Sequence, residues 1–176
     1  MSGTKVLIVV DMQTDFVDGS LGSPEAKSIV PCIKKKIEAY EKDEWKIFFT
    51  RDTHRANYLN TNEGQHLPVE HCIVGTPGWC VTPELNMPKH SHINKPNFGY
   101  INWDAWLPAD VEIIELVGVC TDICVVSNAL ILKALYPEAI IAVDGSCCAG
   151  VTPAKHEAAL EVMRSCQIEV YNGAML

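Results

Sequence analysis

Residues 111–137, VEIIELVGVCTDICVVSNALILKALYP, decide the fold that the sequence predicts. The stretch opens with a mostly apolar run that is short enough for one buried strand. After a sharp turn, residues 122–136 continue as a helix that is apolar nearly all round, which indicates a buried helix. Thr121 or Asp122 can cap this helix at its start, and Pro137 ends it.

Cys124 falls in the first turn of this helix, directly after the predicted strand. The partial positive charge at the start of a helix favours a thiolate, so we expect a depressed thiol pKa. A plain buried cysteine is the usual interpretation of a lone Cys in apolar surroundings. The position in a strand-to-helix turn instead favours a nucleophile.

The composition indicates an ordinary globular protein. The chain has 176 residues, of which 48% are hydrophobic and 20% charged, enough for a single domain over residues 1–176 with a substantial core. A formal net charge of −8 argues against nucleic acid and anionic membrane surfaces as partners. No apolar run is long enough to span a bilayer.

The cysteines and the N-terminal residues bear on the cellular compartment. The chain starts without a signal-peptide pattern, so we expect a protein that is not secreted. The eight cysteines lie in apolar or helical surroundings rather than in a small, loop-rich framework. We therefore expect eight reduced thiols and a cytoplasmic location.

Strand-like and helical patterns alternate along the whole chain. Strands are expected at residues 5–10, 45–50, 91–94, 113–119, 138–143 and 168–171, and the main helices at 24–42, 122–136 and 154–165. This alternation predicts an α/β fold with three α/β/α layers, a doubly wound, mostly parallel sheet of about six strands, and a Rossmann-like arrangement.

Reactive side chains follow the predicted strands, and ligands of such sheets bind at the carboxyl ends of the strands. The strand ends carry, in chain order, Asp11, Asp52 with His54, Lys95, Cys120 to Cys124, and Asp144. Alone, Asp11 could cap a turn and Lys95 could be a solvated surface lysine. Their convergence at one edge of the sheet favours a site.

As a set, these residues match a nucleophile with an acid/base and a cation. Cys124 would attack a carbonyl, Asp11 would shuttle the proton, and Lys95 would stabilise the charged groups. Backbone N–H groups of Cys120 and Cys124 would hold the oxyanion.

A divalent metal is the second expectation from the residues. Asp52, His54 and a later ligand would bind it through nitrogen and oxygen atoms and leave positions open for water or substrate. Residues 55–78 show no clear periodicity and are rich in Asn, Gly, His and Pro. A loop of this length inside a compact domain is usually functional.

Four motifs together resemble those of the isochorismatase-like cysteine hydrolases, among which the nicotinamidases are the most similar. They are Asp11-Met-Gln-Thr-Asp-Phe16, Thr50-Arg-Asp52-Thr-His54, Asn94-Lys95-Pro96 and Gly118-Val-Cys-Thr-Asp-Ile-Cys124, in this order and at compatible spacing. The resemblance covers residues 5 to about 171. It is specific for the superfamily and less specific for one substrate.

The resemblance implies roles for individual residues. Asp11, Lys95 and Cys124 become a catalytic triad, and a cis peptide between Val119 and Cys120 turns backbone amides toward the oxyanion. Asp52, His54 and His71 become metal ligands, and the remaining ligand is Glu63 or His66. Glu63 is favoured because a carboxylate suits Zn²⁺, Mn²⁺ or Fe²⁺ with open positions, and zinc is the first expectation.

One departure concerns the substrate pocket. Nicotinamidases usually place an aromatic residue shortly before the last histidine, where this chain has His66, Leu67 and Pro68. Phe16 and Phe98 can still supply aromatic faces, so Phe16, Leu67 and Phe98 are the expected substrate contacts.

The resemblance implies hydrolysis of nicotinamide to nicotinate and ammonia through a thioester, in a protein that forms a homo-oligomer. The alternatives are an amidase for a carbamoyl or ureido compound, and a catalytically silent module that binds a metal or a partner. Members for carbamoyl or ureido substrates generally lack the full ligand set, and a silent module has no need for Asp11 and Lys95 beside Cys124. Isochorismate hydrolysis fits poorly, because true isochorismatases have a non-nucleophilic residue at the Cys124 position.

Overall fold

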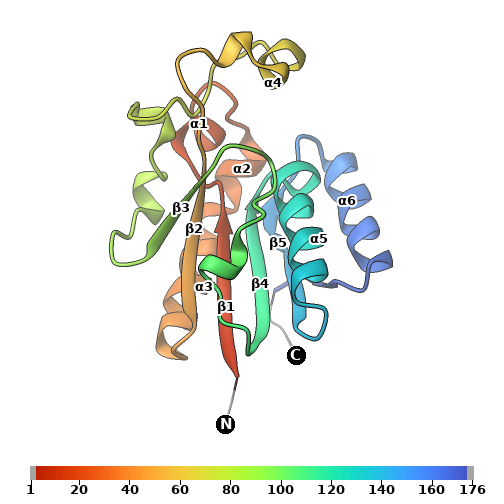
Figure 1. The fold of residues 1–176 in the computed structure, drawn as a ribbon. Coiled ribbons are helices and arrows are strands. Elements are labelled where there is room, and N and C mark those ends of the chain that lie inside the picture. Colours follow the sequence, from red (N-terminus) through yellow and green to blue (C-terminus); the bar gives the residue numbers. More distant parts are fainter. Residues whose placement is uncertain (1–2, 174–176) are drawn as a thin grey trace.

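The structure, a computed structural model, describes residues 3–173 and contains one six-stranded sheet (Figure 1). The strand order is β3-β2-β1-β4-β5-β6, and every neighbouring pair is parallel. The strands are β1 (Thr4–Val10), β2 (Lys46–Asp52), β3 (Ser91–Lys95), β4 (Val111–Val119), β5 (Ile140–Ala149) and β6 (Glu169–Tyr171). The predicted α/β fold with its six-stranded parallel sheet is confirmed.

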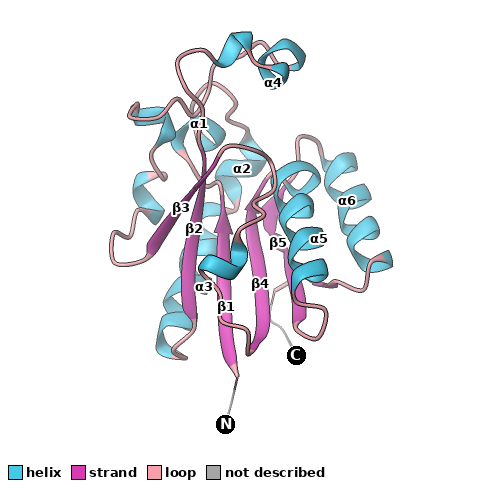
Figure 2. Ribbon diagram, viewed as in Figure 1, coloured by secondary structure: helices cyan, strands magenta, loops and turns pink. Residues whose placement is uncertain are grey.

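Helices pack on both faces of this sheet (Figure 2). They are α1 (Thr14–Val17), α2 (Pro24–Ser28), α3 (Val30–Lys42), α4 (Asn62–His66), α5 (Val126–Leu135) and α6 (Pro153–Ser165), with short 3₁₀ turns at Tyr58–Asn60, Pro77–Trp79, Pro83–Leu85 and Trp103–Ala105. On one face Leu132 of α5 and Leu160 of α6 are buried against the sheet, and on the other Ile33 and Ile37 of α3 are buried. The result is three layers with a core on each side of the sheet.

The strand order fixes where a ligand can bind. From β1 the chain moves outward to β2 and β3, and it then returns to the other side of β1 as β4. The carboxyl ends of β1 and β4 therefore flank the point where the direction of winding changes, the usual ligand position in such sheets. Figure 1 shows the segment that carries α4 (yellow) beyond these carboxyl ends.

The helix predicted over residues 24–42 is interrupted. It consists of α2, whose start is capped by the Ser23 hydroxyl accepting from Ala26 N–H, and α3, which begins at Val30. Pro31 explains the break, because proline inside a helix lacks an N–H and clashes with the preceding turn, whereas it is tolerated in the first turn of a new helix.

The helix after β4 begins as a π-helix, Thr121–Val125, and continues as α5. The predicted cap by Thr121 or Asp122 is wrong, since Cys120 occupies the cap position and no side chain caps the helix. The Thr121 hydroxyl instead pairs with His156 Nδ1 at 2.7 Å, and the Asp122 carboxylate accepts from Val151 N–H at 2.9 Å. Thr121 thus holds the start of this helix against α6, and Asp122 holds it against the segment that leads into α6.

Asp144 does not lie at the edge of the sheet where the sequence places it. Strand β5 runs on to Ala149, because Cys148 still pairs with Gly118 of β4. Asp144 lies inside the strand, and its Oδ2 forms an ion pair with Lys36 Nζ at 2.8 Å. Lys36 Nζ forms a second ion pair with Glu115 Oε1 at 2.6 Å. This buried group joins α3 to the sheet, away from the carboxyl ends of β1 and β4.

The expectation of eight reduced thiols is also wrong. Cys32 of α3 and Cys147 of β5 form a disulfide, with 5.7 Å between their Cα atoms, and the other six cysteines are free. The two residues are 115 positions apart, and α3 packs against β5.

Among residues 3–173, no helix has both the length and the apolar character needed to cross a bilayer.

Candidate active site

Three strands deliver the predicted triad to one place. Asp11 follows β1, Lys95 ends β3, and Cys124 lies in the π-helix after β4. Lys95 Nζ is 2.6 Å from Asp11 Oδ2 and donates to Cys124 Sγ at 3.5 Å. All three side chains are buried. The structure therefore brings together the three residues that the sequence singles out, in a chain from carboxylate to ammonium to thiol.

Asp11 is held on both of its carboxylate oxygens. The Thr50 hydroxyl of β2 donates to Oδ1 at 2.7 Å, while Lys95 pairs with Oδ2. The Asp11 backbone has a φ of 49° and its N–H donates to Thr50, so the chain turns sharply as it leaves β1. Sequence reasoning did not identify Thr50 as part of the site, although it lies two residues before Asp52.

The predicted depression of the Cys124 pKa is wrong. Burial raises the pKa of the Cys124 thiol well above its ordinary value, and the Asp11 carboxylate raises it further against the opposing Lys95 ammonium. Burial also raises the pKa of Asp11, although Lys95 opposes this shift. Burial would lower the pKa of Lys95, but Asp11 and Cys124 hold it above the ordinary value. This environment favours a neutral thiol beside a carboxylate.

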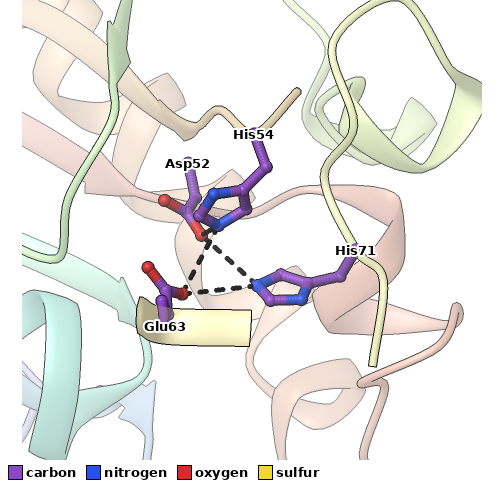
Figure 3. A group of neighbouring side chains, drawn as sticks. All are labelled: Asp52, His54, Glu63 and His71. Atoms are coloured by element: carbon purple, nitrogen blue, oxygen red, sulfur yellow. Dashed lines mark hydrogen bonds and ion pairs between the residues drawn. The ribbon is translucent and has the colours of Figure 1, made fainter. Parts of the chain in front are cut away.

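Figure 3 shows a second group of four side chains, which lies near the triad because Asp52 Oδ1 is 3.7 Å from Lys95 Nζ. Its members are Asp52, His54, Glu63 and His71, and one donor atom from each lies within 4.8 Å of all the others. His54 Nε2 is 2.9 Å from Asp52 Oδ2 and 3.4 Å from Glu63 Oε1, and His71 Nε2 is 3.5 Å from Asp52 Oδ2. We call these four residues the candidate metal group.

Neighbouring residues orient the two histidines. His71 Nδ1 is 2.8 Å from the Val69 carbonyl, which favours a proton on Nδ1 and leaves Nε2 free to face the group. Tyr58 is fully buried, with its ring 4.6 Å from that of His54 and 4.9 Å from that of His71. Its hydroxyl donates to the Leu67 carbonyl at 2.9 Å. Tyr58 lies in the aperiodic loop, where the sequence pattern gives no sign of its burial.

The choice between Glu63 and His66 depends on which face of α4 points inward. Glu63 reaches the other three residues, whereas His66 is exposed and its Nδ1 lies 2.9 Å from the Asn62 carbonyl. Thr61 caps this helix by accepting from Gly64 N–H, which fixes the face that Glu63 occupies. The geometry thus favours Glu63, as the sequence does.

The candidate metal group fits a divalent cation. Two imidazole nitrogens and two carboxylate oxygens form a donor set suited to zinc and similar ions. Asp52 Oδ1 is buried without a hydrogen-bond partner, and burial together with the Asp52 carboxylate raises the pKa of Glu63. Burial alone would raise the pKa of Asp52, but hydrogen bonds from His54 and His71 hold this pKa well below the ordinary value. A cation would relieve the repulsion between these two buried carboxylates.

A cavity of about 410 Å³ is lined by Cys124 of the triad and by three residues of the candidate metal group, Asp52, Glu63 and His71. All three expected substrate contacts, Phe16, Leu67 and Phe98, also line it. Further apolar residues also line it: Leu21, Ala26, Val119, Ile123, Ala149 and Val151.

The backbone beside Cys124 matches an expectation from the resemblance. The peptide between Val119 and Cys120 is cis, which confirms that expectation. The carbonyl of Cys120 accepts from the N–H groups of Ile123 and Val125, so the chain folds back on itself within one turn. This turn places Cys120 and Cys124 in the same wall of the cavity.

The fold and the site together define a hydrolase built on a parallel α/β sheet. The family model of the isochorismatase domain matches residues 5–174, and the chain belongs to this family. The resemblance seen in the sequence is thereby confirmed.

Solved structures share the fold over nearly the whole chain. The pyrazinamidase of Pyrococcus horikoshii, in complex with zinc, has 28% sequence identity and a TM-score of 0.82, over 96% of this chain and 98% of that one. The pyrazinamidase/nicotinamidase of Streptococcus mutans UA159 has 25% identity and a TM-score of 0.80, over 96% and 100%. An isochorismatase family protein of Desulfovibrio vulgaris Hildenborough has 22% identity and a TM-score of 0.84, over 97% and 95%. No curated protein gives a significant match.

Proposed function

We propose that this hydrolase converts nicotinamide to nicotinate and ammonia through a thioester on Cys124, a reaction that would serve NAD salvage. The observation that carries the proposal is the contact of Lys95 with both Asp11 and Cys124, where Cys124 lines a cavity that Asp52, Glu63 and His71 of the candidate metal group also line. Similarity to a pyrazinamidase at 28% identity supports an amide substrate.

In the first half of the reaction, Cys124 Sγ attacks the amide carbonyl carbon while its proton passes to the Asp11 carboxylate. The tetrahedral oxyanion accepts hydrogen bonds from the backbone N–H groups of Cys120 and Cys124. Asp11 then gives the proton to the amide nitrogen, the C–N bond breaks and ammonia leaves. The acyl group remains on sulfur as a thioester.

In the second half, water attacks the thioester carbonyl and gives a proton to Asp11. The C–S bond breaks, the proton returns to sulfur and the carboxylic acid product is released, so the site recovers its starting state. Lys95 keeps its positive charge throughout, because it is paired with Asp11 at 2.6 Å and lies near Asp52 at 3.7 Å. It stabilises whichever of the carboxylate and the thiolate carries the negative charge.

Asp52, His54, Glu63 and His71 would hold one divalent ion, with zinc proposed first and manganese or iron as alternatives. When bound, such an ion supplies an electrophilic centre to which a ring nitrogen can bind. Phe16 lies beside this group, with its ring 5.5 Å from that of His71, and offers an aromatic face to a planar substrate. Phe98 and Leu67 would cover the substrate from the outer part of the cavity.

The substrate is tested by ammonia release from a panel of amides. Nicotinamide and pyrazinamide should be hydrolysed, whereas benzamide should react roughly ten- to a hundredfold more slowly, because it lacks the ring nitrogen that would pair with the candidate metal group. Equal rates for nicotinamide and benzamide would show that this group does not hold the substrate.

A carbamoyl or ureido amide is the second candidate, and Leu67 is the observation that favours it. Leu67 lines the cavity where nicotinamidases usually have an aromatic residue, so this wall offers less surface to a pyridine ring. Turnover of such an amide without turnover of nicotinamide would decide for this candidate. A catalytically silent module would hydrolyse neither class.

The ligand assignment gives a second test. Asp52→Ala and Glu63→Ala should lose nearly all bound metal, while His66→Ala, a substitution in the same short helix as Glu63, should keep the wild-type content. Metal analysis of the purified proteins measures this difference. Equal metal content in Glu63→Ala and wild type, with loss in His66→Ala, would reverse the assignment.

The cytoplasmic location and the homo-oligomeric state expected from the sequence stay predictions. Light scattering coupled to size-exclusion chromatography measures the oligomeric state directly.

A further inference from the structure

Gln13 has an unusual place between the two halves of the site. It lies two residues after Asp11, at the cap position of α1, and its side chain is fully buried. Its Nε2 donates to the Asp52 carbonyl at 2.8 Å, and its Oε1 accepts from the Asp52 N–H at 2.7 Å. The side-chain amide therefore pairs with the backbone of Asp52 much as a neighbouring strand would.

The same amide holds a third segment. Gln13 Nε2 also donates to the Trp79 carbonyl at 2.9 Å, and Trp79 Nε1 donates to the Thr53 hydroxyl at 2.9 Å. The Gln13 amide thus links the backbone of Asp52 to the loop that carries Trp79, and Trp79 in turn forms a hydrogen bond with the side chain of Thr53. Because Gln13 N–H donates to the Asp11 carbonyl at 2.7 Å, the backbone that carries Asp11 belongs to the same network.

These bonds bear on the direction of the Asp52 carboxylate. Asp52 is the last residue of β2. Beyond it, the Thr53 N–H still donates to the Lys95 carbonyl of β3 at 3.0 Å, and the His54 N–H donates to the Cys72 carbonyl at 2.9 Å. Its Oδ2 must face His54 and His71, at 2.9 and 3.5 Å, while Oδ1 lies 3.7 Å from Lys95. Fixing both backbone groups of Asp52 fixes the position from which its side chain extends.

We propose that Gln13 is a positioning residue that holds Asp52 in the geometry needed for binding a divalent cation. The proposal rests on the metal site of the proposed function. Gln13 does not line the cavity, so it acts through Asp52 and not on the substrate. Loss of an outer partner of a metal ligand typically lowers metal affinity about 10- to 100-fold.

Asn128 offers a matched control on the other side of the site. It is also fully buried, and its Nδ2 donates to the carbonyls of Cys124 at 2.8 Å and Phe98 at 3.1 Å. Its Oδ1 accepts from Tyr100 N–H at 2.9 Å. It therefore makes the same number and kind of hydrogen bonds as Gln13, but it holds the backbone of Cys124 rather than that of Asp52.

The experiment compares Gln13→Met with Asn128→Leu, each of which removes three side-chain hydrogen bonds of a buried amide and adds no charge. The metal-stripped proteins are titrated with Zn²⁺ against a chromogenic chelator, and thermal unfolding is followed without metal. We expect Gln13→Met to bind zinc about 10- to 100-fold more weakly than wild type, and Asn128→Leu to bind it within about threefold of wild type. Their unfolding temperatures without metal should fall by similar amounts, since each loses a comparable buried network.

Gln13→Glu is the second variant, because it keeps the acceptor for Asp52 N–H and loses both donors; it should also bind zinc more weakly than wild type. Wild-type zinc affinity in a folded Gln13→Met, or an equal loss in Asn128→Leu, overturns the proposal while leaving the metal site intact. Failure of both Gln13 variants to fold assigns the residue to the fold and also overturns it. Absence of zinc binding in the wild type instead contradicts the metal site itself.

Discussion

Cys124→Ala is expected to lower the rate of ammonia release from nicotinamide by on the order of 10⁴-fold or more. The physical reason is that, among the described residues that line the cavity, Cys124 is the cysteine whose sulfur accepts from Lys95. The thiol is small and buried, so alanine should leave the fold intact, which circular dichroism can verify. Initial rates under saturating substrate measure the effect.

Cys166→Ala is the control, because Cys166 is a free and exposed cysteine at the end of α6. Cys147 is unsuitable for this purpose, since it is disulfide-bonded to Cys32. Full turnover by Cys124→Ala would exclude a covalent mechanism through this residue.

Asp11→Asn should lower kcat by about 10²- to 10⁴-fold and leave KM nearly unchanged. Asparagine keeps the shape of the side chain and can still accept from Thr50, but it cannot take a proton from the thiol. The Asp11 carboxylate raises the pKa of Cys124, so its removal should lower that pKa under the remaining influence of Lys95. Alkylation of Cys124 at neutral pH should therefore become faster while hydrolysis becomes slower.

These opposite changes separate loss of a proton acceptor from general damage to the site. Asp18→Asn is the matched control, because Asp18 is an exposed carboxylate that pairs only with Lys27 among the described residues. It should change neither rate. Parallel slowing of alkylation and hydrolysis in Asp11→Asn would mean that the substitution disrupts the triad, and unchanged hydrolysis would mean that Asp11 is not the base.

The triad could be predicted from the sequence because it depends on local patterns and one rule of sheet geometry. Asp11, Lys95 and Cys124 each lie at the end of a predicted strand or in the turn that follows it, and parallel strands bring such positions to a common edge. Asp144 shows the limit of this reasoning. Residues 145–149 look like a turn after a strand, but they stay in β5 through pairing with β4, and only the partner strand reveals this.

The remaining differences depend on contacts that are distant in sequence. The helices α1 and α4 span four and five residues, too few for a periodic pattern. The pairing of Cys32 with Cys147 requires α3 to lie on β5. The Cys124 pKa depends on burial and on Asp11, which outweigh the helix start in a turn that is a π-helix.

The disulfide between Cys32 and Cys147 has a consequence for the connectivity of the molecule. The covalent ring that it closes contains Cys124, Lys95 and the whole candidate metal group, whereas Asp11 lies outside it on the N-terminal arm. A protease that cuts the exposed stretch around Arg55 would therefore produce two fragments, one with Asp11 and one with Cys124, that remain a single covalent molecule. The cut would be visible in electrophoresis only after reduction, and until then the two fragments would stay at the high mutual concentration that a tether provides.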